Sequence, residues 1–272
     1  MWDPAVYRRF GAERARPFFD LVTRIDADRP RAVVDLGCGP GDLTATLAER
    51  WPLARVTGID SSVEMIDKAS AGPSPVDFRL GDVRDWSPTA EVDVLVTNAT
   101  LQWVPGHREL LVRWARELPA GAWLAMQVPG NFGAASHRLL REVARSAPFA
   151  AVTGDLVRDE PVDDAAGYAA LLTAEGAAVD AWETTYVHLL PDDGAEHPVL
   201  RWMEGTALRP IKAAVGAGDW ERFRSALRDR LRAAYPVRDG VVAFPFRRIF
   251  LVARVPQDLP GGKDSVGEGV PS

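Results

Sequence analysis

A glycine-rich segment that contains two carboxylates is the part of this 272-residue chain best suited to chemistry. It runs from Val33 to Asp42 and reads Val-Val-Asp-Leu-Gly-Cys-Gly-Pro-Gly-Asp. The apolar start predicts a buried strand, and the glycines that follow predict a tight turn into a helix. Glycine accepts positive φ and has no Cβ, so a ligand can lie directly against such a loop. The segment therefore predicts a ligand-binding turn.

Two common glycine-rich nucleotide loops do not fit this spacing. The glycines are Gly37, Gly39 and Gly41, so Asp42 stands where a dinucleotide-binding loop needs its third glycine. The Gly-Lys-Ser/Thr ending of a phosphate-binding loop is also missing from the segment. Its carboxylates make it a poor site for a pyrophosphate and a good one for a cation. The pattern from Asp35 to Gly41 resembles the first motif of class I S-adenosylmethionine-dependent methyltransferases, whose sulfonium ligand has no phosphate.

Polar residues also end the next three predicted strands. Asp60 ends the second strand, nineteen positions after Gly41, where an acid that binds a ribose belongs in a doubly wound sheet. Asp82 follows the third strand and Asn98 follows the fourth. Ligands of open α/β sheets bind outside the carboxyl ends of the strands. Four signals in the right order therefore favour one cofactor site along this edge.

The resemblance implies a role for the residues at these strand ends. In the family, the acid in the place of Asp82 binds the adenine amino group, the backbone N–H of Val83 meets the ring, and Asn98 lines the methionine end. The other residues of the implied cofactor site lie around the loop and the ribose: Asp35, Gly37, Gly39, Gly41, Asp60 and Ser61. The cofactor that the resemblance implies is S-adenosylmethionine, with S-adenosylhomocysteine as the product.

Each of these residues also has an ordinary structural interpretation. Asp60 is placed to cap a helix, with Glu64 completing a capping box. Asp82 is typical of a turn, and Asn98 tolerates a left-handed corner. Cys38, the only cysteine, excludes a disulfide and is expected to pack rather than react. The histidines show no metal-ligand spacing, so we expect no metal.

The alternation of elements predicts an α/β fold with a Rossmann-like, doubly wound, seven-stranded and mostly parallel sheet and a helical cap. After the strand of the glycine loop, strands are expected over residues 54–60, 76–80, 92–97, 123–128, 179–190 and 241–255. Helices are expected over residues 6–25, 43–50, 65–70, 110–118, 133–146, 163–176, 198–208 and 220–235. The insertion between the last two strands is the natural place for a lid.

This alternation predicts four regions. Residues 1–28 would be an N-terminal helix that covers the site, and residues 29–132 the cofactor-binding core. Residues 133–255 would hold the remaining strands and the cap insertions. Residues 256–272 lack core-forming side chains and are expected to be disordered.

Composition narrows the function classes. Hydrophobic residues make up 47% of the chain, enough for one large core. The net charge of −6 and the lack of a basic run argue against a nucleic-acid partner. The sequence has neither a signal peptide nor a stretch of about 18 apolar residues, so we expect a cytosolic protein without a membrane partner. It gives no reason to choose an oligomeric state.

Four further segments are similar to the family of trans-aconitate 2-methyltransferases, namely residues 7–17, 98–103, 205–210 and 243–254. The second of these also resembles methyltransferases that act on malonyl carrier proteins, and the last two are more discriminating. The resemblance runs nearly end to end and implies O-methylation of a carboxylate of trans-aconitate. Two alternatives stay open: another acid, such as a malonyl thioester on a carrier protein, or a non-catalytic protein that binds the cofactor.

A small polycarboxylic acid as substrate would make arginines more important than a base. An ionised carboxylate is already nucleophilic at neutral pH because its pKa is about 4, so no catalytic base is expected. Arginine can hold a carboxylate through two parallel hydrogen bonds. The substrate candidates are Arg14, Trp103, Tyr186, Arg209 and Arg248. The family has one arginine where this chain has Arg247 and Arg248; Arg248 is the better match, and which of the two faces the site stays open.

Overall fold

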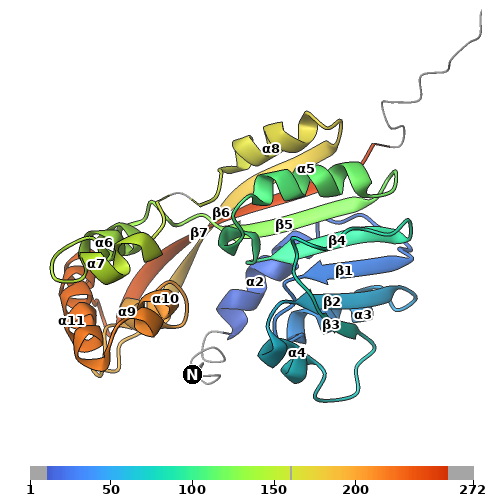
Figure 1. Ribbon diagram of the computed structural model, residues 1–272. Coiled ribbons are helices and arrows are strands. Elements are labelled where there is room, and N and C mark those ends of the chain that lie inside the picture. Colours follow the sequence, from blue (N-terminus) through green and yellow to red (C-terminus); the bar gives the residue numbers. More distant parts are fainter. Residues whose placement is uncertain (1–10, 160, 257–272) are drawn as a thin grey trace, which may run out of the picture.

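One sheet organises the protein (Figure 1), of which a computed structural model describes residues 11–159 and 161–256. Within them the strand order is β3-β2-β1-β4-β5-β7-β6. The first five strands pair in parallel, and β7 is antiparallel to both β5 and β6. The predicted seven-stranded, mostly parallel sheet is confirmed. The strands are β1 (Ala32–Leu36), β2 (Arg55–Asp60), β3 (Asp77–Leu80), β4 (Val92–Asn98), β5 (Trp123–Pro129), β6 (Ala178–Pro191) and β7 (Val241–Arg254).

Helices cover both faces of this sheet, which makes it doubly wound. On one face Phe18 and Leu47 pack against apolar side chains such as Val33. On the other face Trp114 and Leu172 pack against neighbours that include Val34. Successive strand residues point to opposite faces, so β1, which is buried along its whole length, feeds both cores. The helices of these layers are α2 (Gly11–Val22), α3 (Asp42–Arg50), α4 (Val63–Ala69), α5 (His107–Glu117) and α8 (Ala165–Thr173).

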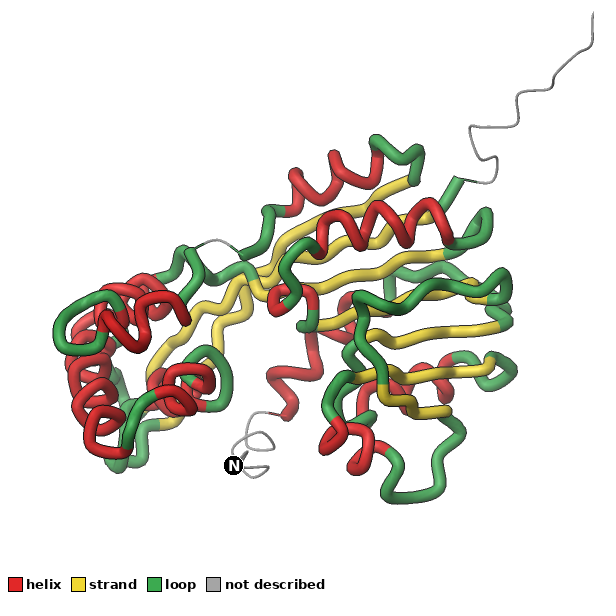
Figure 2. The backbone as a smooth tube through the Cα atoms, in the orientation of Figure 1, coloured by secondary structure: helices red, strands yellow, loops and turns green. Residues whose placement is uncertain are grey.

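A cap is built on the far ends of β6 and β7. These strands have 14 residues each, and their far halves run beyond the rest of the sheet into a group of helices (Figures 1 and 2). Trp202, Phe223 and Phe244 belong to the separate hydrophobic core there. Two chain segments supply the helices: α6 (Ala135–Ala144) and α7 (Ala150–Thr153) follow β5, and α9 (Pro198–Glu204), α10 (Arg209–Ala214) and α11 (Ala217–Ala234) lie between β6 and β7.

The structure corrects one expected helix of the cap. The helix predicted over residues 198–208 ends at Glu204, and a second helix begins at Arg209. Pro210 lies in the first turn of this second helix, where a proline is favoured because no intrahelical N–H is needed there. Arg209 therefore begins a helix instead of following the end of one. The predicted helix start at residues 6–10 and the predicted disorder of residues 257–272 lie outside the described residues.

No helix in the described ranges is both long and apolar enough to cross a membrane. Nor do the described side chains contain a group of histidine, cysteine, aspartate or glutamate residues that could hold a metal ion.

Candidate functional site

The glycine loop joins β1 to α3 and adopts the backbone that its sequence predicts. Gly37, Gly39 and Gly41 have φ values of 81°, 56° and 86°. A Cβ at Gly37 would clash with the side chain of Thr100, and one at Gly41 would lie 2.6 Å from the ring of Phe78. A Cβ at Gly39 would meet no atom of the described residues within 4 Å. The outer two glycines thus allow close packing within the protein, and open space lies beside the middle one.

The carboxylate of Asp60 ties the end of β2 to this loop. Its Oδ2 accepts a hydrogen bond of 2.9 Å from the backbone N–H of Gly39, and its Oδ1 accepts one of 2.9 Å from the N–H of Ser62. The residue that caps α4 is Ser62, whose hydroxyl accepts from Met65. The helix-capping interpretation of Asp60 is therefore wrong. Ser61, next to it, is exposed.

Asp35 lies beneath the loop rather than on it. Its side chain is 3% exposed, and the hydroxyl of Thr44 donates a hydrogen bond of 2.6 Å to its Oδ2. Burial raises the pKa of Asp35 to about 6, the Thr44 hydrogen bond opposes that shift, and the charge of Asp60 adds to it. Ionisation of Asp35 therefore lowers the free energy of unfolding unless a cation lies close to its carboxylate.

Asp35→Asn tests this cost. The folded protein holds the higher pKa, so it binds more protons than the unfolded chain between about pH 4 and pH 6, and the Asp35 carboxylate destabilises it as pH rises through that window. Asparagine keeps an acceptor for Thr44 without the charge. We expect the variant without ligand to be more stable than the wild type by about 1–3 kcal/mol at pH 8 and equal to it near pH 4. Urea titrations at both pH values measure this; a difference that does not change with pH would contradict the assignment.

The end of β3 carries Asp82 and Val83. Asp82 accepts from the backbone N–H of Arg84 at 2.9 Å and pairs with the guanidinium of the same residue. The side-chain hydrogen bond from Arg84 holds the pKa of Asp82 at about 2. This local ring matches the turn interpretation. Val83 is buried in the core, and a surface hollow of about 210 Å³ beside Asp82 is lined by Ile59, Arg79, Leu80, Gly81, Asp82, Asp85 and Trp86.

Asn98 ends β4, and the left-handed corner falls on the next residue. Ala99 has φ 54°, so the left-handed interpretation of Asn98 is wrong by one position. Asn98 is in register with Gln127 on the neighbouring parallel strand β5, which puts the two side chains on one face of the sheet. Among the described residues, Oδ1 of Asn98 has no hydrogen-bond partner although it is buried. This carbonyl oxygen can accept a hydrogen bond from a ligand.

The two adjacent arginines of β7 point to opposite faces of the sheet. Arg247 is partly exposed and forms a bidentate pair with Glu183, with N···O distances of 2.5 and 2.7 Å. Arg248 is 7% exposed; its Nη1 donates to Oε1 of Gln127 at 3.4 Å, and its guanidinium lies 4.6 Å from the Phe246 ring centre. The structure therefore puts Arg248 on the face of Gln127 and Asn98, and Arg247 on the other.

The other predicted substrate-binding residues lie in different parts of the structure. Tyr186 is buried, and its hydroxyl donates to Oδ2 of Asp20 on α2 at 2.6 Å, so it fastens that helix to β6. Trp103 is 52% exposed and lies beneath the guanidinium of Arg158 from the cap side. Arg209 is exposed at the start of α10. Arg14 lies on α2, but its side chain is outside the described residues.

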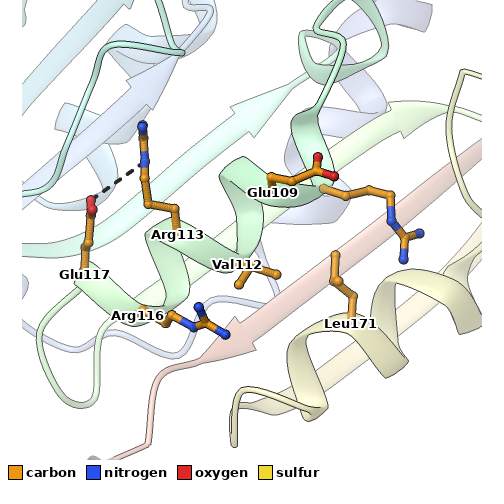
Figure 3. A pocket seen from close by; sticks show the side chains of 7 residues that line it. Glu109, Val112, Arg113, Arg116, Glu117 and Leu171 are labelled. Atoms are coloured by element: carbon orange, nitrogen blue, oxygen red, sulfur yellow. Dashed lines mark ion pairs between the residues drawn. The ribbon is translucent and has the colours of Figure 1, made fainter.

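A second surface hollow, of about 570 Å³, lies between α5 and α8 and is not part of this arrangement (Figure 3). Three arginines line it, and each already pairs with a carboxylate: Arg108 with Asp163, Arg113 with Glu117 and Arg116 with Glu175. Such exposed, paired charges contribute little free energy and do not point to an anion site.

Sequence reasoning missed Gln127. The segment Trp-Leu-Ala-Met-Gln-Val of residues 123–128 was interpreted only as a strand, although a glutamine near the carboxyl end of an otherwise apolar strand is a signal. In the structure this side chain is 1% exposed and contacts Arg248.

The loop region fits the predicted sulfonium cofactor. Open space begins at Gly39, next to the carboxylate of Asp60, and the buried acceptor of Asn98 lies on a neighbouring strand end. Carboxylates and carbonyl oxygens near the loop suit a ligand with positive charge and N–H groups, and not a pyrophosphate.

Comparisons with known proteins agree with this geometry. Residues 33–121 match the family described as methyltransferase domain. A trans-aconitate 2-methyltransferase of Mycolicibacterium gilvum (strain PYR-GCK) is 56% identical over 258 residues, which cover 94% of this chain and 99% of the relative. One of Rhodococcus jostii (strain RHA1) is 53% identical over 262 residues, covering 94% and 100%.

The sheet and its helices are also found in a solved structure. The YcgJ protein of Bacillus subtilis superposes with a TM-score of 0.57, covering 90% of this chain and 100% of that one. At 14% identity this likeness shows the fold alone. Identity above one half along nearly the full length shows more, and the chain belongs to the trans-aconitate 2-methyltransferase family.

Proposed function

We propose that the protein is an S-adenosylmethionine-dependent O-methyltransferase that esterifies one carboxylate of trans-aconitate. The relatives whose sequences match nearly end to end are named for that substrate. The observation that carries the proposal is the buried Arg248, whose guanidinium lies beside Gln127, near the carboxyl end of β5. A buried arginine in such a place is suited to a carboxylate because its planar fork binds both oxygens.

Residues of the chain would hold the cofactor along the edge of the sheet. Asp60, already fixed by the N–H groups of Gly39 and Ser62, would accept from the ribose hydroxyls. Asp82 would bind the adenine amino group, the backbone N–H of Val83 would contact the adenine ring, and Asn98 would line the methionine end of the cofactor. When bound, the sulfonium supplies an electrophilic methyl group.

The chain's task toward the acid is positional. A carboxylate needs no proton removed, so the residues must orient it, exclude water and balance the charge of its other carboxylates. Arg248 is the best placed for this, and Arg14, Arg209, Trp103 and Tyr186 remain predicted pocket residues. We expect no histidine to act as a base: His188 stacks on Trp202 in the cap with ring centres 4.7 Å apart, and His107 bonds Tyr168 at 2.7 Å on the other face of the sheet.

The pH profile follows from this mechanism. At saturating cofactor we expect kcat to be flat from about pH 6 to pH 9 and to fall only as substrate carboxylates become protonated near their pKa of about 4. Burial lowers the pKa of His137 to about 4, so this histidine stays neutral over the flat range, and burial also lowers the pKa of His107. Rates measured across this range decide the matter; a basic limb near pH 7 that disappears in His188→Ala would show a missed proton transfer.

Screening small mono-, di- and tricarboxylic acids with methyl-labelled cofactor tests the proposal. We expect label in a trans-aconitate monomethyl ester. Label only in a malonyl thioester on a carrier protein would replace the substrate, and cofactor binding without product from any acid would indicate a non-catalytic binding protein.

A further inference from the structure

Gln127 combines two properties that set it apart at the strand ends. It is buried near the end of β5, and its amide contacts the guanidinium of Arg248. Arginine has donors only, so the oxygen of the Gln127 amide must face Arg248, and this fixes the amide's orientation. The Nε2 donor is therefore directed away from Arg248. Among the described residues it has no acceptor, although it is buried.

A buried N–H donor without an acceptor destabilises a folded protein unless a ligand accepts its hydrogen bond. Buried amide groups are almost always hydrogen-bonded, because burial removes the water that would otherwise pair with them. On this face of the sheet Gln127 is in register with Asn98 of β4 and Phe250 of β7, and Arg248 lies two residues before Phe250. Its donor thus lies beside a guanidinium and beside the residue predicted to line the reactive end of the cofactor.

We infer that Nε2 of Gln127 donates a hydrogen bond to a carboxylate oxygen of the substrate and, with Arg248, selects a polycarboxylic acid. This rests on the proposed function. Two neighbouring strands would then offer different hydrogen-bonding groups to the two ligands. The Asn98 oxygen is an acceptor and suits the cationic cofactor, whereas the Gln127 amide N–H is a donor and suits the anionic substrate. The alternative is that Gln127 only supports Arg248 through its oxygen.

Gln127→Glu separates these two roles because glutamate has nearly the same shape. A glutamate oxygen would still accept from Arg248, and more strongly, so a purely supporting role would survive. A substrate donor would be lost and replaced by a like charge facing the carboxylate, so Gln127→Glu should be more damaging than Gln127→Ala. Thr185→Glu is the matched control: it adds the same charge at an exposed position of β6 opposite Arg247, on the other face of the sheet.

The experiment measures kcat and KM for trans-aconitate, with S-adenosylhomocysteine affinity by calorimetry as a readout of fold and cofactor site. We expect KM to rise about 100-fold in Gln127→Glu and about tenfold in Gln127→Ala, with Thr185→Glu and all cofactor affinities within about threefold of the wild type. A Gln127→Glu enzyme with wild-type KM, or one less impaired than Gln127→Ala, overturns the inference and leaves the proposed function intact. A wild type that binds the cofactor but methylates no acid overturns both.

Discussion

Arg248→Lys is expected to reduce kcat/KM for trans-aconitate almost as far as Arg248→Ala does. Arg248 is 7% exposed and donates to Gln127, so its planar guanidinium is held in one orientation. A lysine ammonium cannot reproduce that two-pronged geometry. Loss of a charge-assisted contact to a desolvated carboxylate should cost about 2–4 kcal/mol in kcat/KM, or roughly 30- to 1000-fold.

Arg247→Lys is the matched control for this prediction. Arg247 is the adjacent residue of β7, but it lies on the opposite face and pairs with Glu183. We expect kcat/KM to change less than about threefold in this variant, since surface pairs contribute little. Steady-state rates with trans-aconitate and with a monoacid analogue complete the comparison. If Arg248→Lys impairs both substrates equally, Arg248 is structural and the polycarboxylate assignment loses its support in the geometry.

Gly39→Ala is expected to remove most cofactor affinity while the protein stays folded. A Cβ at Gly39 meets none of the described protein atoms within 4 Å, so the substitution fills the open space that the described residues leave beside the loop. The positive φ of 56° adds about 1 kcal/mol of strain for a residue with a Cβ. We expect the Kd for S-adenosylmethionine to rise about 100-fold, because the methyl group would occupy the place of a ligand that lies against the backbone.

Gly240→Ala shows how much of that effect is strain alone. Gly240 has φ 76° and equally open surroundings, but it lies in the turn before β7 in the cap. Both variants should lose about 1 kcal/mol of unfolding free energy, and only Gly39→Ala should lose cofactor affinity. Unchanged calorimetric affinity in a folded Gly39→Ala protein would mean that the loop does not hold the cofactor.

The sequence allowed the central strands to be predicted because β1, β4 and β5 are short and mostly apolar runs. The expected strand over residues 92–97 matches β4 to within one residue, and that over residues 123–128 matches β5 equally well. The positive φ at the glycine loop followed directly from residue type. Local pattern was sufficient wherever a local interaction decides the conformation.

Features that depend on distant residues could not be predicted in this way. Alternation along β7 makes Arg247 and Arg248 face opposite sides, but only the packing of Glu183 and Gln127 decides which arginine is buried. The cap also contains α6 and α7, which come from a different chain segment than α9, α10 and α11. Helices from both segments are needed because the far halves of β6 and β7 form an apolar face that both segments cover. The importance of Gln127 likewise depends on its neighbour across the sheet.

A crystal structure of the protein with S-adenosylhomocysteine and trans-aconitate would show directly whether Arg248 and Gln127 bind the substrate. We expect the ribose hydroxyls on Asp60, the cofactor backbone against Gly39, and one carboxylate of the acid hydrogen-bonded to both Arg248 and the Gln127 amide. An acid bound elsewhere, with Arg248 and Gln127 contacting only protein, would contradict it.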